Sequence, residues 1–269
     1  MPVEFLGIAA TNDGSETTAR SGAAFDKEYT LRLARAHEDH GWDRVLFAYG
    51  AGSPDPAPAA AAYAAGGAEA DIYCLWGEPL EETAQQIEAV KAAAQAAGRT
   101  DVPRIQVAFR PIIAPTEELA WEKAHRTVGA IKQHRQAGLA RRHQGGVLEA
   151  PAPQNTGSQR LIAIAAAGDR YDRALWTPTA AATGGAGNSN ALVGTPETVA
   201  QALLDYHDLG VDILSARGYD LLGDAIDFGR YVIPLVREEV AKRDVVRGAA
   251  VVAANGAGSP RQSLAAVRG

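Results

Sequence analysis

The chain has 269 residues, of which 46% are apolar and 6% aromatic. A chain of this length can bury one substantial core or two small ones, and its many alanines and glycines favour closely packed helices against a sheet over an aromatic-rich β-sandwich. The net charge of −6 argues against nucleic acid as the main partner, because phosphate binding requires a basic surface.

The first half of the chain contains four short apolar segments that are typical of buried strands. They cover residues 3–10, 44–50, 70–77 and 104–114. Helices are predicted after the first, third and fourth segments. The first helix is capped by Asp26 and stops at Gly41, the second stops at Gly98, and the third opens at Thr116.

Residues 138–190 have no clear period, so we predict irregular helix and long loops there. Regular order returns at Thr195, which caps a helix that Gly210 ends, and the strand VDILSA follows at once. A last amphipathic helix over residues 221–243 is expected to kink at Pro234. The tail, residues 244–269, has no period and is expected to be disordered.

Strand and helix alternate five times, and the strands are almost continuously apolar. This pattern predicts parallel βα units in one domain, residues 1–243, and leaves open a barrel or an open doubly wound sheet. No G-x-G-x-x-G follows any strand, so a Rossmann dinucleotide site has no support. The polar clusters TNDGSE, GAGSPD, WGEP and ARGYD follow strands, where the loops of a (β/α) barrel build the active site.

The remaining titratable motifs are weak. The single cysteine, Cys74, excludes an intrachain disulfide, and its apolar strand favours an inert core thiol. His37 and His40 lie three apart on a charged helix without a third ligand nearby, so we expect a solvated surface and predict no metal site. The N-terminus lacks the features of a signal peptide, and no apolar run reaches the roughly 18 residues of a membrane span. We therefore expect a cytoplasmic protein without membrane contact.

Two long segments resemble the bacterial luciferase-like family of flavin-dependent monooxygenases, and within it the alkanesulfonate monooxygenases. They are DIYCLWGEPLEETAQQIEAVKAAAQAAGR and GGAGNSNALVGTPETVAQALLDYHDLGVDILSARGYDLLGDAIDFGRYVIPLV. The resemblance implies a (β/α)8 TIM barrel that takes reduced FMN from a separate NAD(P)H-dependent flavin reductase. The enzyme would activate O₂ and cleave the C–S bond of an alkanesulfonate to give an aldehyde and sulfite. Use of the deazaflavin cofactor F420 in place of FMN stays open.

The resemblance also implies roles for individual residues. Tyr219, at the end of the last strand, is expected to hydrogen-bond the flavin oxygen adduct or a sulfonate oxygen. Ser53 stands where close relatives carry a cysteine, and Thr11 where histidine is common, so both are catalytic candidates. Trp76 and Glu78 follow a strand and are candidates for contact with the flavin. Plainer alternatives are a rim tyrosine, a simple turn at Ser53 and a tryptophan that closes the barrel top.

One position in the matching lid loop lacks its usual cation. Thr183 stands where the family has an arginine before the GGAG sequence, which begins here with Gly184 and Gly185. The change removes a positive charge that suits an anionic substrate. Arg217 is a candidate to replace that charge in part.

The largest departure from the family is an absence. Its third, fourth and fifth strands should lie between the segments 44–50 and 70–77, with a DERY-type motif and a Gly-Gly-Ser-Ser turn that holds the flavin phosphate. Neither occurs here, and at about 30 residues per unit about ninety residues are missing. We predict a barrel shortened to about five βα units, the family's strands 1, 2, 6, 7 and 8, with a seam near residues 57–68.

A shortened barrel allows an interpretation without catalysis. Five strands cannot fill a barrel interior built from layers of eight strands. The chain could then be a non-catalytic truncated barrel that acts through a partner or through self-association. Because an incomplete sheet edge needs to be covered, we expect a homo-oligomer.

Overall fold

The computed structural model describes most of the chain, and every structural statement below concerns this part: residues 2–10, 12–22, 26–47, 67–68, 70–144, 156–185 and 189–256. The strands are β1 (Glu4–Ala9), β2 (Arg44–Phe47), β3 (Ile72–Trp76), β4 (Arg104–Ile113), β5 (Arg170–Tyr171), β6 (Leu175–Trp176), β7 (Ala191–Gly194) and β8 (Ile213–Ala216). The helices are α1 (Lys27–Asp39), α3 (Leu80–Ala96), α4 (Glu117–Gln144), α5 (Thr156–Ala167), α6 (Pro178–Thr183), α7 (Pro196–Asp208), α8 (Leu221–Tyr231) and α9 (Ile233–Gly256). The five predicted strands are confirmed as β1, β2, β3, β4 and β8.

The order of the strands is that of a barrel. Neighbouring strands run β2-β1-β8-β4, and β3 also pairs with β4. All four pairings are parallel. The last strand, β8, therefore lies beside the first, β1, as a closed (β/α) barrel requires. The series β3-β4-β8-β1-β2 reproduces the family's strands 6, 7, 8, 1 and 2 in sequence, which decides between a barrel and a doubly wound sheet.

The barrel arc is open between β2 and β3. Within the described residues, β2 pairs with β1 and β3 pairs with β4, and the two edge strands do not pair with each other. Side chains on these edges are exposed, among them Val45, Leu46 and Ile72. The two strands on either side of the predicted seam thus stand at opposite edges, where the three missing units of a full barrel would lie. The seam itself falls almost wholly outside the described residues.

β4 is long enough to carry two neighbours on one edge. Its first half pairs with β3, from Ile72 beside Arg104 onward, and its second half pairs with β7, from Ala191 beside Arg110 onward. The antiparallel strands β6 and β5 extend the sheet from β7. The second half of β4 is therefore buried deep in the sheet, although the arc as a whole is open.

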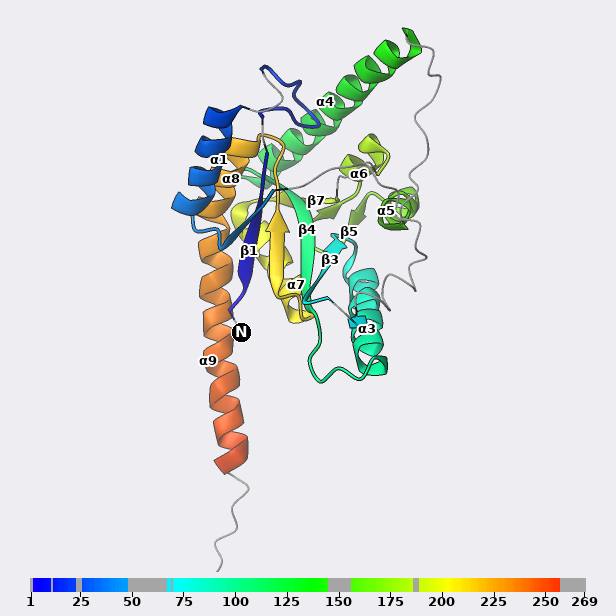
Figure 1. Ribbon diagram of the computed structural model, residues 1–269. Coiled ribbons are helices and arrows are strands. Elements are labelled where there is room, and N and C mark those ends of the chain that lie inside the picture. The colour runs from blue at the N-terminus through cyan, green and yellow to red at the C-terminus, as the bar shows by residue number, and fades with distance from the viewer. Residues whose placement is uncertain are drawn as a thin grey trace, which may run out of the picture.

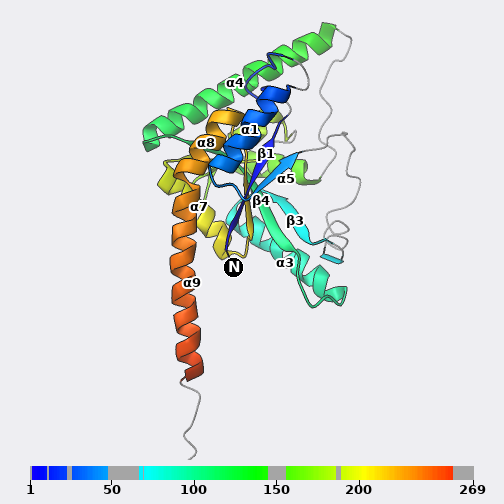
Figure 2. The ribbon, with the colours of Figure 1, turned by 60° about the vertical axis from the view of Figure 1, so that its left-hand side comes forward.

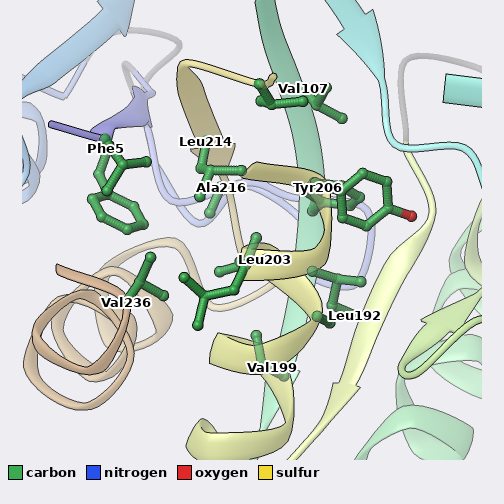
Figure 3. Close-up of a cluster of buried hydrophobic side chains, with 14 of the residues drawn as sticks. Phe5, Val107, Leu192, Val199, Leu203, Tyr206, Leu214, Ala216 and Val236 are labelled. Carbon is green, nitrogen blue, oxygen red and sulfur yellow. The ribbon is translucent and has the colours of Figure 1, made fainter. Parts of the chain in front are cut away.

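The main core lies between the sheet and helices α7, α8 and α9. Phe5, Val107 and Leu214 project from β1, β4 and β8 toward Leu203 of α7 and Val236 of α9 (Figure 3). All five side chains are buried. Helices α1, α8 and α9 lie along one side of the sheet, while α4 crosses beyond the carboxyl ends of the strands (Figures 1 and 2). This packing buries one face of the sheet and fixes the direction of each strand end.

The region predicted as irregular is more regular than expected. Helix α4 continues to Gln144, and α5, the β5–β6 hairpin, α6 and β7 occupy much of residues 156–194. These elements are short or alanine-rich, so their apolar residues do not show a clear helical or strand periodicity. Tertiary packing, as in the contacts of α6 with α4 and α5, stabilises them in place of local pattern.

The C-terminal part also differs from expectation. The chain breaks between α8 and α9 at Val232, and Pro234 lies in the first turn of α9, where its missing N–H costs no helical hydrogen bond. α9 then continues through Gly256, past the start of the predicted disorder at residue 244 (Figure 1). Residues 257–269 lie outside the described part. None of the described helices has the length and apolar character needed to cross a membrane.

Two side chains differ from the prediction in their burial. His37 is buried, not solvated, because its ring fills the space beside Gly7, where an added Cβ would lie 2.1 Å from His37 Cδ2. Its Nδ1 lies 2.8 Å from the carbonyl oxygen of Leu33, and burial lowers the pKa of the imidazole. Cys74 is exposed, not buried, because β3 is an edge strand of the open arc.

Candidate functional site

Charged side chains meet at the carboxyl ends of three neighbouring strands. The loop of residues 12–22 follows β1 and carries Glu16, Arg110 lies in the second half of β4, and Arg217 follows β8 directly. The register sets Phe109 beside Ala216, so the residues that follow them are also neighbours. The fold therefore brings Glu16 close to Arg110, which is 94 positions away in the sequence, and to Arg217, which is 201 positions away.

One carboxylate bridges both arginines. The Nη2 and Nη1 atoms of Arg110 donate to Glu16 Oε1 at 2.7 Å and Oε2 at 3.3 Å. Arg217 Nη1 donates to Glu16 Oε1 at 3.0 Å. We call these three residues the C-terminal cluster. Only 4% of the Arg110 side chain is exposed, against 19% for Glu16 and 20% for Arg217, so the ion pairs are largely shielded from water.

The electrostatics of the C-terminal cluster follow from this burial. Burial alone would raise the pKa of Glu16, but the charges of Arg110 and Arg217 outweigh it and hold the pKa below its usual value. Burial, together with the neighbouring charge of Arg110, lowers the pKa of Arg217. Arg217 Nε is buried and has no hydrogen-bond partner among the described residues. The three side chains of the C-terminal cluster thus carry two positive charges and one negative charge. One N–H group of the cluster, that of Arg217 Nε, donates to no described residue.

Tyr219 lies against the same cluster. Its ring is buried, and Arg110 Cζ lies 5.5 Å from the ring centroid, which is a cation–π distance. The backbone between Arg217 and Tyr219 is held firmly: Tyr219 N donates to Asp224 Oδ2 at 2.7 Å, and Arg110 Nη1 donates to the Gly218 carbonyl oxygen at 3.3 Å. The structure thus brings together two residues that the sequence singled out, Arg217 and Tyr219.

Gly218 is required by close packing at this turn. An added Cβ would lie 2.1 Å from Asp224 Cβ, which no side chain tolerates. Asp224 also accepts from Asp220 N at 3.0 Å and from Lys123 Nζ at 2.9 Å. The turn that carries Tyr219 is therefore fixed to the first turn of α8 and to α4, and this preorganises the site.

Glu78, a predicted flavin contact, lies in a buried hydrogen-bond network at the end of β3. Its buried carboxylate accepts from Arg160 Nε at 2.9 Å and from Gln86 Nε2 at 2.9 Å, and its carbonyl oxygen accepts from the hydroxyl of Tyr206 at 2.7 Å. These bonds tie α5, α3 and α7 together at the end of β3. Trp76 is the last residue of β3 and is partly buried. Neither residue has a described hydrogen bond or ring contact with the C-terminal cluster.

The residues expected to belong to a lid lie at the end of α6. Thr183 Oγ1 donates to the Ala180 carbonyl oxygen at 2.9 Å, and Gly184 and Gly185 have φ values of 66° and 72°, which favour glycine. Arg135 of α4 donates to the Ala182 carbonyl oxygen at 3.0 Å. A cation from another helix therefore stands beside Thr183. Thr11 and Ser53 lie outside the described residues.

The sequence reading missed Glu16 and Arg110. Glu16 belongs to the polar segment TNDGSE, which was noted as a whole without a role for its carboxylate. Arg110 interrupts an apolar strand, RIQVAFRPII, and a charge within a buried strand is a signal because it requires a partner. That signal could have selected Arg110, but it could not have named Glu16 as the partner.

Known proteins resemble this chain in sequence and fold. The family model described as luciferase-like monooxygenase matches residues 64–213. Solved structures with a similar fold include a riboflavin lyase (RcaE) with modified FMN and riboflavin, at 24% identity and a TM-score of 0.48 over 66% of this chain and 40% of that chain. DmoA from Hyphomicrobium sulfonivorans matches at 19% identity and a TM-score of 0.47, over 72% of this chain and 41% of that one.

A deazaflavin protein has a similar fold as well. The coenzyme F420-dependent tetrahydromethanopterin reductase from Methanopyrus kandleri matches at 16% identity and a TM-score of 0.39, over 82% of this chain and 58% of that one. The chain thus spans between 40% and 58% of the length of these three proteins. At these identities and with TM-scores below 0.5, these likenesses support no statement about function. Because the family model covers more than half of the sequence, the chain belongs to the luciferase-like monooxygenase family.

Proposed function

We propose that this chain acts as a flavin-dependent monooxygenase on a small substrate with an anionic group, of the alkanesulfonate type. The observation that carries the proposal is the meeting of Arg110, Arg217 and Tyr219 at the carboxyl ends of β4 and β8. In (β/α) barrels this end of the strands holds the reacting groups. Membership of the luciferase-like monooxygenase family supports the choice of reaction.

Reduced FMN, delivered by a separate NAD(P)H-dependent flavin reductase, is the proposed cofactor. FMN carries a phosphate, and the guanidinium N–H groups of the C-terminal cluster fit an oxyanion, since Arg217 Nε has no described partner. The sequence lacks the Gly-Gly-Ser-Ser turn, so Arg110 and Arg217 are the residues we propose to hold the anionic group of the flavin or of the substrate. When bound, the reduced flavin supplies the activation of O₂.

The protein's own residues would contribute binding and orientation. Arg110 and Arg217 can fix an oxyanion by charge-assisted hydrogen bonds that are strong in a buried setting. Tyr219, held by its backbone bond to Asp224, carries a phenol that can donate a hydrogen bond to an oxygen of the reacting groups. The low exposure of Arg110 and Tyr219 keeps water from competing for these donors.

The cofactor and the reaction can be tested separately. The purified chain is titrated anaerobically with reduced FMN, and sulfite release from octanesulfonate is then measured with a flavin reductase, NADH and O₂. We expect saturable binding and sulfite formation. Replacing FMN by reduced F420 in the same titration decides between the two flavins. A chain that binds neither is not an active member of the family.

Tyr219→Phe tests the role of the phenol. General acid–base or hydrogen-bond donation by a positioned side chain contributes roughly 100-fold or more to kcat, so we expect kcat to fall by at least about tenfold with little change in KM. Tyr231→Phe is the matched control, because Tyr231 is exposed on α8. Equal kcat values for the two variants would remove Tyr219 from the reaction.

The open arc favours a second candidate, a non-catalytic protein that self-associates. The unpaired edges β2 and β3 with exposed Val45, Leu46 and Ile72 are surfaces that other strands can pair with. Analytical ultracentrifugation tests this reading, and an inactive chain that sediments as a defined oligomer supports it. Sulfite release by the purified chain would contradict it.

A further inference from the structure

The carboxylate of Glu16 occupies the place where the two arginines of the C-terminal cluster would receive a ligand. We infer that Glu16 is an exchangeable internal counter-ion, which an incoming oxyanion displaces from Arg110 and Arg217. The inference deepens the proposed function and rests on it for the identity of the anion. The ligand class is a sulfonate or a phosphate group, which share the chemistry that a pair of guanidinium groups recognises.

The geometry of the bridge is that of a bound oxyanion. Glu16 takes two donors from Arg110, at 2.7 and 3.3 Å, and one from Arg217, at 3.0 Å. A carboxylate has two oxygens, and both are engaged by these three bonds. A sulfonate or phosphate has at least three oxygens, so it can also reach Arg217 Nε, which has no partner in the described part of the chain. The site therefore offers more donors than Glu16 uses.

The arginines are fixed, and the glutamate is on a loop. Arg110 belongs to β4 and also bonds the Gly218 carbonyl oxygen, and the turn after Arg217 is held by Asp224. Glu16 lies on the loop 12–22, whose tip is exposed from Thr18 onward. A carboxylate on a surface loop can withdraw while the two guanidinium groups stay in place.

The loop has internal hydrogen bonds that do not depend on Glu16. Gly14 N donates to Asn12 Oδ1 at 3.0 Å, and Ser21 N donates to Asp13 Oδ1 at 3.0 Å. Ser15 N donates to the Thr18 carbonyl oxygen at 2.9 Å. Because these bonds close within the loop, it can move as a unit when its glutamate is displaced.

The charge balance favours a stronger anion. In the C-terminal cluster two guanidinium groups share one carboxylate in a mostly buried setting, where charges interact more strongly than in water. A phosphate dianion or a sulfonate with more oxygens would satisfy the cluster better. Anion binding and the departure of Glu16 are thus linked, and Glu16 acts as a competitor that weakens the measured affinity.

The test is the affinity of the full chain, free of flavin, for sodium sulfate, methanesulfonate and inorganic phosphate, measured by isothermal titration calorimetry. Glu16→Gln keeps the shape of the side chain and removes its charge. Because Glu16→Gln removes a charged competitor held by three charge-assisted hydrogen bonds, we expect the anion to bind at least about tenfold more tightly to Glu16→Gln than to the unchanged chain. Equal or weaker binding to Glu16→Gln would overturn the inference.

Two sets of variants make the result specific. Glu4→Gln is the matched control, because Glu4 also bridges two arginines, Arg44 and Arg104, at the other end of the sheet; its anion affinity should equal that of the unchanged chain. Arg217→Met should abolish the binding. If Glu16→Gln fails to fold, Glu16→Asp, one methylene shorter, weakens the same bridge, and again tighter anion binding supports the inference while unchanged binding contradicts it.

The anion series identifies the source of the oxyanion. Preference for methanesulfonate points to the substrate, and preference for phosphate, with competition by FMN, points to the cofactor. A gain of affinity in Glu16→Gln without any sulfite release would support the counter-ion and refute the monooxygenase. Sulfite release by the unchanged chain, with no gain of anion affinity in Glu16→Gln, would support the monooxygenase and refute the counter-ion.

Discussion

The two ends of the sheet carry the same three charges in different surroundings. At the amino ends of the strands, Glu4 bridges Arg44 at 2.5 Å and Arg104 at 3.1 Å; we call this the N-terminal cluster. Its side chains are 24%, 50% and 31% exposed in that order, whereas Arg110 in the C-terminal cluster is 4% exposed. β4 contributes an arginine to each cluster, Glu4 is the first residue of β1, and Glu16 lies on the loop that follows β1.

The comparison shows that burial, more than the ion pairing itself, decides how much such a cluster contributes to the free energy of unfolding. The pKa of Glu4 is lowered mainly by its hydrogen bond from Arg44, but water screens an exposed pair, and such pairs contribute about 0–1 kcal/mol. Charges shielded from water cannot be solvated when a partner is lost, so removing one partner from a buried pair costs several times more. We therefore expect the C-terminal cluster to contribute more to stability than the N-terminal cluster.

Removing an arginine from each cluster should give the largest contrast. Arg110→Met leaves Glu16 partly buried beside a single guanidinium, and we expect it to lower the free energy of unfolding by about 3 kcal/mol. Arg104→Met, on the same strand, should lower it by less than about 1 kcal/mol. Urea unfolding followed by circular dichroism measures both. Equal losses would mean that the two ends do not differ in the way their exposure implies.

Acid titration should give a smaller contrast. The pKa of Glu16 is lower in the folded chain than its ordinary value of about 4.3, so its contribution to stability is fully present above that value. The contribution is lost as the pH falls through the lower pKa of the folded state. We therefore expect the stability difference between the unchanged chain and Glu16→Gln to shrink steadily as the pH falls below about 5. A difference that stayed constant over this range would show that Glu16 gains nothing from its two arginines.

Salt should give the smallest contrast. Raising NaCl from about 0.05 M to 0.5 M shortens the Debye length to a few ångströms, so the few tenths of a kcal/mol lost in Glu4→Gln at low salt should vanish. The loss in Glu16→Gln should persist, because its pairs are shielded from the solvent. Parallel urea titrations at the two salt concentrations measure this, and equal salt sensitivity would contradict the assigned burial.

The sequence predicted the elements of the barrel arc, but it missed the short elements of residues 156–194, the length of α9, and the contacts between distant elements. The strands and helices of the barrel arc can be predicted from the local spacing of apolar residues. The family motif singles out Tyr219 as a candidate site residue. The pairing of Glu16 with Arg110 could not be predicted, because 94 positions separate them and only the order β4-β8-β1 brings them together. Burial of His37 depends on the missing Cβ of Gly7, and exposure of Cys74 depends on the open edge, neither of which is a property of the local segment.

The sequence by itself therefore determined five parallel strands of the barrel, most of the helices that follow them, and the family, because period, caps and motifs are local features of the chain. The tertiary structure alone decided that, within the described residues, β2 and β3 stand at opposite edges of the barrel arc and do not pair with each other. It also decided that one of two similar charge clusters is buried. The physical reason is that exposure depends on which elements cover a strand end, and that covering is a product of long-range packing.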